Sequence, residues 1–133
     1  MQAIDSQAKA LLAARAALEK HAEDVAVMDL RGVSTVADFF IVCTAGSGPQ
    51  IRALQDHIET TLARHQCPVD HTEGTLSSGA ARAFTPEFQW VLMDCGEIVV
   101  HLFNRYARGF YRLEDLWADA PRVPLPVGDA PHP

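Results

Sequence analysis

The sequence predicts an α/β or α+β fold in which a single mixed β-sheet is flanked by helices. Two observations lead to this prediction: apolar runs of strand length alternate with amphipathic helical segments, and no internal repeat is visible. A chain of 133 residues that is 48% hydrophobic suits one compact domain with one core. We expect that domain to cover residues 1–120. The proline-rich tail, residues 121–133, is expected to be extended or disordered.

The first third of the chain predicts one helix and two strands. The alanine-rich residues 5–21 form the helix. Its expected buried stripe follows helical spacing and consists of Ile4, Ala8, Leu11, Leu12, Arg15 and Leu18. Residues 24–30 and 37–45 form strands, and the near-continuous apolar sequence ADFFIVCTA indicates that the second strand is central and covered on both faces.

A second helix begins at the Gly-Ser-Gly sequence of residues 46–48. Ser47 offers an N-cap hydroxyl, and Pro49 lies in the first turn. The apolar residues that then recur at helical spacing are Ile51, Leu54, Ile58 and Leu62. A short polar strand is expected within residues 68–74.

The last part of the chain predicts a loop, a hairpin and a helix. Residues 75–89 lack a steady period and read as a loop. The sequence WVLMDCGEIVVHLF, residues 90–103, predicts two apolar strands joined by a tight turn. Aromatic and leucine residues three to four apart predict a final helix within residues 104–120.

Charge and cysteine content restrict the class of protein. Eleven basic and seventeen acidic residues give a net charge of −6, which argues against binding through nucleic-acid phosphates and favours a basic partner. Cys43, Cys67 and Cys95 are widely spaced, so neither a disulfide framework nor a zinc site is indicated. No apolar run approaches the roughly 18–20 residues that cross a bilayer. We expect a cytoplasmic protein that does not bind membranes.

The expected hairpin turn carries two carboxylates. If Cys95 and Gly96 are its central residues, Asp94 and Glu97 face each other, and their repulsion costs about 0.2–1 kcal/mol. Three interpretations stay open: a solvated turn, a docking edge for a basic partner, or a catalytic pair. The spacing weighs against the pair, because carboxylates three residues apart cannot both reach one face of a straight strand.

Signals of catalysis are weak elsewhere. Gly-Ser-Gly permits a phosphate-binding turn as well as a helix cap, but no lysine lies beside it, so capping by Ser47 is the simpler interpretation. The six histidines form no H-x-x-x-H or H-E-x-x-H pattern. His101 alternates with apolar residues, as a satisfied strand histidine would, and a polar interface role is the second interpretation. We expect no catalysis, no metal and no cofactor.

Three strings of residues occur in order in the chain. The first, at residues 29–44, is D-x-x-G-x-S-x-x-A-D-x-x-I-x-x-T. The second, at residues 90–103, is W-x-x-x-D-x-G-[DE]-x-x-V-H-x-F, and F-Y-x-L-E-x-L-W follows it. With these strings the chain resembles the Iojap or ribosomal silencing factor family from about residue 7 to residue 118. The resemblance implies a nucleotidyltransferase-like core without the catalytic carboxylate pattern, and therefore no enzyme.

The resemblance also implies a partner and a role. Members bind the large ribosomal subunit through its ribosomal protein number fourteen, block joining of the small subunit, and lower translation under nutrient limitation. Organellar members assist large-subunit assembly, and that role is one alternative here. A nucleotide-binding enzyme of the nucleotidyltransferase type is the other. No sequence-specific contact with nucleic acid is implied, and a homodimer stays open.

Carried over by position, the implied partner surface includes Trp90, Asp94, Cys95, Gly96 and Glu97, with Ser34, Arg108 and Tyr111 as neighbours. Trp90 is the expected anchor, because a few aromatic residues carry most of the energy of an interface; a core tryptophan is the alternative. The sequence departs from the family at Cys95, where a leucine or an aromatic residue is usual. About ten added residues precede Trp90, and they include Phe84 and Phe88.

Overall fold

The structure is a computed structural model of the whole chain and describes residues 5–35, 37–74, 90–105, 108 and 120–125. Its elements are helix α1 (Ser6–Glu19), strands β1 (Glu23–Asp29) and β2 (Phe39–Ala45), helix α2 (Gly48–Arg64), and strands β3 (His71–Gly74), β4 (Trp90–Asp94) and β5 (Ile98–Asn104). This order follows the prediction for these parts of the chain. The expected loop and most of the expected final helix lie outside the described residues.

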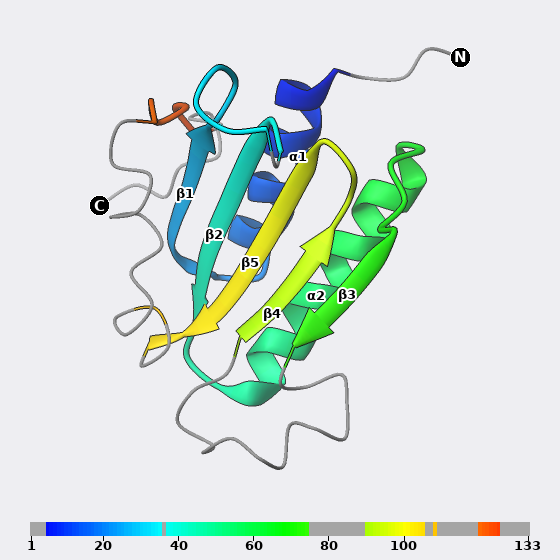
Figure 1. Cartoon of the computed structure of the whole chain (residues 1–133). Coiled ribbons are helices and arrows are strands. Elements are labelled where there is room, and N and C mark those ends of the chain that lie inside the picture. The colour runs from blue at the N-terminus through cyan, green and yellow to red at the C-terminus, as the bar shows by residue number, and fades with distance from the viewer. Residues whose placement is uncertain (1–4, 36, 75–89, 106–107, 109–119, 126–133) are drawn as a thin grey trace.

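The five strands form one mixed sheet in the order β1-β2-β5-β4-β3. Strands β2 and β5 are parallel, and the other neighbouring pairs are antiparallel. Helices α1 and α2 both lie on one face of this sheet (Figure 1). The α+β prediction is therefore confirmed. Strand β2 is an interior strand with all seven residues buried, as its apolar sequence predicts, while β5 holds the middle position.

The alternating strand residues divide the core between the two faces of the sheet. The helix-covered face joins strand residues such as Ile41, Met93 and Val100 to the buried residues of α1 and α2. The opposite face, called the second face below, carries a separate buried cluster. Phe40 and Phe103 belong to that cluster, and the half-buried Trp90 and Leu92 pack against it.

The two helices bury their faces differently. In α2 the predicted stripe is confirmed, since Ile51, Leu54, Ile58 and Leu62 are all fully buried. In α1 the predicted stripe is wrong. Its buried residues are Ala10, Ala13, Ala14, Ala16 and Ala17, while the leucines are only partly buried and Ala8 and Arg15 are exposed. Small side chains let α1 approach the sheet and α2 closely, so larger side chains occupy the rim of this contact.

The start of the proline-rich segment lies along the outer edge of β1. The Asp29 N–H donates to the Pro121 carbonyl at 2.8 Å, and the Val123 N–H donates to the Val27 carbonyl at 2.9 Å. Two apolar side chains of residues 121–125 also pack against the helix-covered core. The pairing of this segment with β1 covers an edge that would otherwise present unpaired backbone groups. Residues 126–133 of the expected tail lie outside the described residues.

Candidate partner-binding surface

The turn between β4 and β5 is shifted by one residue from the prediction. Asp94 belongs to the ladder, and the Cys95 N–H donates to the Ile98 carbonyl at 3.0 Å, so Gly96 and Glu97 are the central residues. Gly96 has a φ of 84°, which the first central position of a type II′ turn requires. The prediction that Asp94 and Glu97 face each other is therefore wrong. A glycine at the first central position matches the twist of a hairpin and avoids a positive φ at cysteine.

The two carboxylates have different internal partners. Asp94 Oδ1 accepts a hydrogen bond from the Gly96 N–H at 2.9 Å, which holds the turn. Glu97 Oε1 lies 2.5 Å from Lys9 Nζ on α1. The hydrogen bond and the charge of Glu97 raise the pKa of Lys9. One carboxylate thus shapes the turn, and the other attaches it to the first helix.

Two further acidic residues lie beside this turn. The Asp38 N–H donates to the Glu97 carbonyl at 2.7 Å, and the Asp70 N–H donates to the Asp94 carbonyl at 2.8 Å. We call Asp38, Asp70, Asp94 and Glu97 together the acidic turn. Four carboxylates at one end of the sheet create a negative potential that attracts basic groups.

Cys95 lies within the acidic turn, but its side chain points into the core. It is 6% exposed and belongs to the cluster on the helix-covered face. Burial raises the pKa of its thiol to about 12, so the group is neutral at pH 7. The Cys95 side chain, which the resemblance implies is part of the partner surface, therefore faces the helix-covered core and not the solvent. The sequence could not assign the face, because the turn register decides it.

Trp90 lies at the opposite end of β4 from the acidic turn. Trp90, Leu92 and Asp94 lie on the second face, and at about 3.4 Å per residue Trp90 and Asp94 are roughly 14 Å apart along the strand. The indole is partly exposed, and it stacks on Phe103 with ring centroids 5.3 Å apart. The indole of Trp90 is therefore packed against Phe103 and also partly accessible to solvent. This position lies between the anchor interpretation and the core interpretation.

His101 contacts the indole of Trp90. Trp90 Nε1 donates a hydrogen bond to His101 Nδ1 at 3.2 Å, and the His101 side chain is buried at 3% exposure. Burial disfavours the imidazolium and lowers the pKa of His101 to about 4. Among the described residues, no partner lies within hydrogen-bonding distance of Nε2. The expected satisfied strand histidine is thus satisfied at one nitrogen only.

The remaining predicted residues lie apart. Ser34 is half-buried in the loop between β1 and β2, where its N–H donates to the Leu30 carbonyl at 2.9 Å and the neighbouring Val33 is 44% exposed. This loop is at the same end of the sheet as the acidic turn (Figure 1). Arg108 is at the other end, where Nη1 donates to Thr44 Oγ1 at 2.6 Å. Tyr111 lies outside the described residues.

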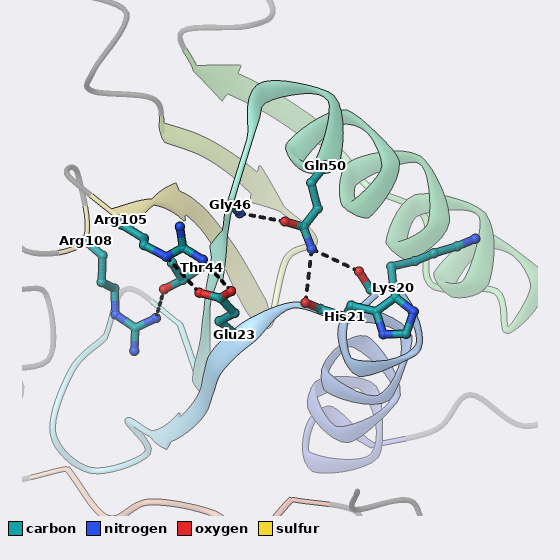
Figure 2. Close-up of polar contacts among 8 residues, drawn as sticks. All are labelled: Lys20, His21, Glu23, Thr44, Gly46, Gln50, Arg105 and Arg108. Atoms are coloured by element: carbon teal, nitrogen blue, oxygen red, sulfur yellow. Dashed lines mark hydrogen bonds and ion pairs between the residues drawn. The ribbon is translucent and has the colours of Figure 1, made fainter.

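The Gly-Ser-Gly turn is held by hydrogen bonds with the Gln50 residue of α2, and the contact with Gly46 is drawn in Figure 2. The Gly46 N–H donates to Gln50 Oε1 at 2.6 Å, and Ser47 Oγ accepts from the Gln50 N–H at 3.2 Å. Gln50 Nε2 donates in turn to the carbonyls of Lys20 and His21 at 3.2 and 3.0 Å. The capping prediction for Ser47 is confirmed. A phosphate group at this turn would have to displace the Gln50 carboxamide.

The polar groups around this turn are paired in a similar way. Arg105 makes two hydrogen bonds to the Glu23 carboxylate, at 3.0 and 2.6 Å, and Arg108 contacts Thr44 next to them (Figure 2).

Within the part of the chain that the structure describes, no three His, Cys, Asp or Glu side chains are grouped to hold a metal ion. No helix in that part is long and apolar enough to cross a membrane.

Sequence reasoning missed Lys9, Gln50 and the pairing of Trp90 with His101. Lys9 and Gln50 act on residues far away in the sequence, and no local pattern reports such contacts. The pairing of Trp90 with His101 had a signal in the sequence. In an antiparallel hairpin, diagonal residues on one face lie close enough for aromatic side chains to touch, and Trp90 and His101 are diagonal in the β4–β5 ladder.

A family model described as "Ribosomal silencing factor during starvation" matches residues 3–132. The chain belongs to this family. The ribosomal silencing factor RsfS of Bacillus subtilis is 37% identical over 117 residues, which cover 88% of this chain and 91% of that protein. The chloroplastic protein Iojap of Arabidopsis thaliana is 30% identical over 97% of this chain and 50% of its own length.

Two crystal structures share the fold of this family member. A Bacillus halodurans protein aligns with a TM-score of 0.69 at 32% identity and covers 90% of this chain and 100% of its own. A Chromobacterium violaceum protein aligns with a TM-score of 0.73 at 25% identity and covers 96% and 97%. The family resemblance carried by the sequence strings is confirmed.

Proposed function

We propose that the chain binds the large ribosomal subunit through ribosomal protein number fourteen and blocks joining of the small subunit. Translation in the cytoplasm is then repressed when nutrients are limiting. Membership of the ribosomal silencing factor family supports action at the ribosome. The finer claim, which subunit and which protein are bound, rests on the resemblance of the sequence strings.

One observation supports the docking mode most directly. The second face carries a partly exposed tryptophan at one end of β4 and Asp94 of the acidic turn at the other. An aromatic anchor provides lasting affinity, while charges at the rim orient the partner and increase the association rate. A net charge of −6 suits a ribosomal protein, whose basic side chains lie between its contacts with RNA.

The test is co-sedimentation with purified ribosomal particles in sucrose gradients. The chain should travel with large subunits and be absent from small subunits and joined ribosomes. In a light-scattering assay of subunit joining, preincubation of large subunits with the chain should reduce the amplitude, whereas preincubation of small subunits should not. Equal recovery with both subunits would contradict the proposal.

A variant set shows whether the second face carries the binding. Trp90→Ala removes the proposed anchor, and Val25→Ala removes a half-buried apolar side chain that packs against the helix-covered core. Only Trp90→Ala should reduce recovery with large subunits. A parallel thermal-shift measurement with Mg²⁺ and nucleotides addresses the enzyme alternative, since a ligand specific for the native state raises the melting temperature.

A further inference from the structure

We infer that His101 is a positioning residue that holds the indole of Trp90 in the orientation in which the partner meets it. The inference rests on the proposed function, because it assigns a role within the same binding surface. It is carried by the contact between the two side chains and by the way the other rings surround them.

The contact fixes the indole in two ways. The Trp90 Nε1–H is directed at His101 Nδ1, 3.2 Å away, and the two rings stack at 5.9 Å with an interplanar angle of 26°. Phe103 supports the indole from β5 at 5.3 Å and 24°. A hydrogen bond at the edge of a ring, together with stacking on its face, restricts both side-chain torsions of a tryptophan.

His101 is itself held in place. Phe40 from β2 meets its ring edge-on, with centroids 4.7 Å apart and an angle of 68°. The imidazole and the Phe103 ring are nearly parallel, at 6°. A buried ring between two aromatic neighbours cannot change rotamer without opening the core. The direction of its Nδ1 lone pair is therefore set by β2 and β5, which are both interior strands.

The hydrogen bond also determines the tautomer. Nδ1 accepts from the indole, so it carries no proton, and the neutral ring carries its proton on Nε2. Burial keeps the imidazole neutral at pH 7, with a pKa of about 4. The acceptor for the tryptophan is therefore present under physiological conditions, and the imidazole provides it without carrying a charge.

Positioning affects affinity because an ordered side chain loses less conformational entropy when it binds. Immobilising one flexible side chain at an interface reduces affinity by about threefold to tenfold, and a side chain that is already fixed avoids this loss. Removing the acceptor should therefore weaken binding by about that factor. The loss should be smaller than that caused by deleting the indole.

The experiment compares four variants of the full chain. His101→Phe keeps a ring and removes the acceptor, whereas His101→Asn keeps a carbonyl oxygen close to the Nδ1 position. Trp90→Phe keeps a ring and removes the donor, and the fourth chain combines Trp90→Phe with His101→Phe. Affinity for purified large subunits is measured for each. If His101→Phe does not fold, His101→Leu takes its place.

We expect His101→Phe to bind about threefold to tenfold more weakly and His101→Asn to recover most of that loss. In the Trp90→Phe background, His101→Phe should cause no further loss, because the hydrogen bond is already absent. The ¹⁵N–¹H spectrum of the indoles gives a readout that does not depend on the ribosome. The Trp90 Nε1–H should shift and exchange faster in His101→Phe, with the indole of Trp117 as internal reference.

The outcomes separate this inference from the proposed function. If the unaltered chain binds large subunits and His101→Phe binds equally well, or if its loss persists in the Trp90→Phe background, the positioning role is wrong and the function stands. If the unaltered chain does not bind large subunits, the proposed function is wrong. The indole resonance then decides alone: no change in His101→Phe overturns the positioning of Trp90, and a shift supports it for another partner.

Discussion

Lys9 Nζ and Glu97 Oε1 lie 2.5 Å apart, which joins α1 to the β4–β5 turn across 88 positions of sequence. Glu97 keeps about half of its side-chain exposure, at 51%, whereas Lys9 keeps 16%. Glu97 therefore shows its carboxylate to the solvent, and the cation that neutralises it is the less exposed partner. The strength of the field at the acidic turn depends on Lys9 as well as on the four acidic residues.

Single charge changes at the acidic turn should alter the association rate in opposite directions. Asp94→Asn keeps an oxygen that can accept the Gly96 N–H and removes one negative charge, so association with large subunits should slow. Lys9→Gln removes the buried side of the ion pair and should speed association. Stopped-flow binding at 0.1 M and 1 M salt is the measurement, because the Debye length falls from about 10 Å to 3 Å and both effects should shrink. Changes of the same sign would contradict a steering role.

Trp90→Ala should act on dissociation instead. Loss of a central interface aromatic costs on the order of 2 kcal/mol or more, and the loss should persist at high salt because it is not electrostatic. Surface plasmon resonance on immobilised large subunits measures the dissociation rate. The melting temperature of the isolated variant is the control: if the variant is destabilised but its folded fraction binds normally, Trp90 is a core residue. The anchor would then have to be sought at Phe84 or Phe88.

The pKa of His101 predicts a loss of stability in mild acid. The unfolded chain binds a proton at the ordinary pKa of 6.5, while the folded chain does so only at about 4, so the free energy of unfolding falls as the pH drops through this window. At about 1.4 kcal/mol per pKa unit, the loss approaches about 3 kcal/mol by pH 4. Urea unfolding of the chain and of His101→Asn, from pH 7.5 to pH 4, checks this. The variant should lose less stability over the range; equal losses would place the His101 pKa near its ordinary value.

The sequence predicted those features that follow from a local hydrophobic period. The prediction failed for features that depend on contacts between distant residues or on the register of a turn. The stripe of α2 was readable because Ile51, Leu54 and Ile58 are large and lie on one side. The stripe of α1 was not, because alanine has a weak hydrophobic signal and its burial follows from how closely the helix packs. Gly96 indicated that a turn is present, but the sequence did not show which position of the turn this glycine occupies. The Lys9–Glu97 contact has no local signal at all.

Gln50→Ala should destabilise the fold without weakening partner binding by the folded chain. Its carboxamide accepts from the Gly46 N–H and donates to the carbonyls of Lys20 and His21, so it joins the start of α2 to the end of α1. Loss of these bonds should lower the free energy of unfolding by about 1–2 kcal/mol. Gln55→Ala, in the middle of the same helix, is the matched control and should cost less. Equal effects in urea unfolding would show that the Gln50 bonds contribute nothing specific.

Residues 121–125 should stabilise the edge of β1 through backbone hydrogen bonds, and proline substitutions can test this at single positions. The Val123 N–H donates to the Val27 carbonyl, whereas Arg122 lies opposite Met28 at a position whose N–H points away from β1. Val123→Pro should therefore lower the free energy of unfolding by about 1–3 kcal/mol, and Arg122→Pro should have a smaller effect. Hydrogen exchange at the Asp29 N–H, which donates to the neighbouring segment, should accelerate in Val123→Pro. If both proline variants behave alike, side-chain packing of the segment, and not its pairing with β1, holds it in place.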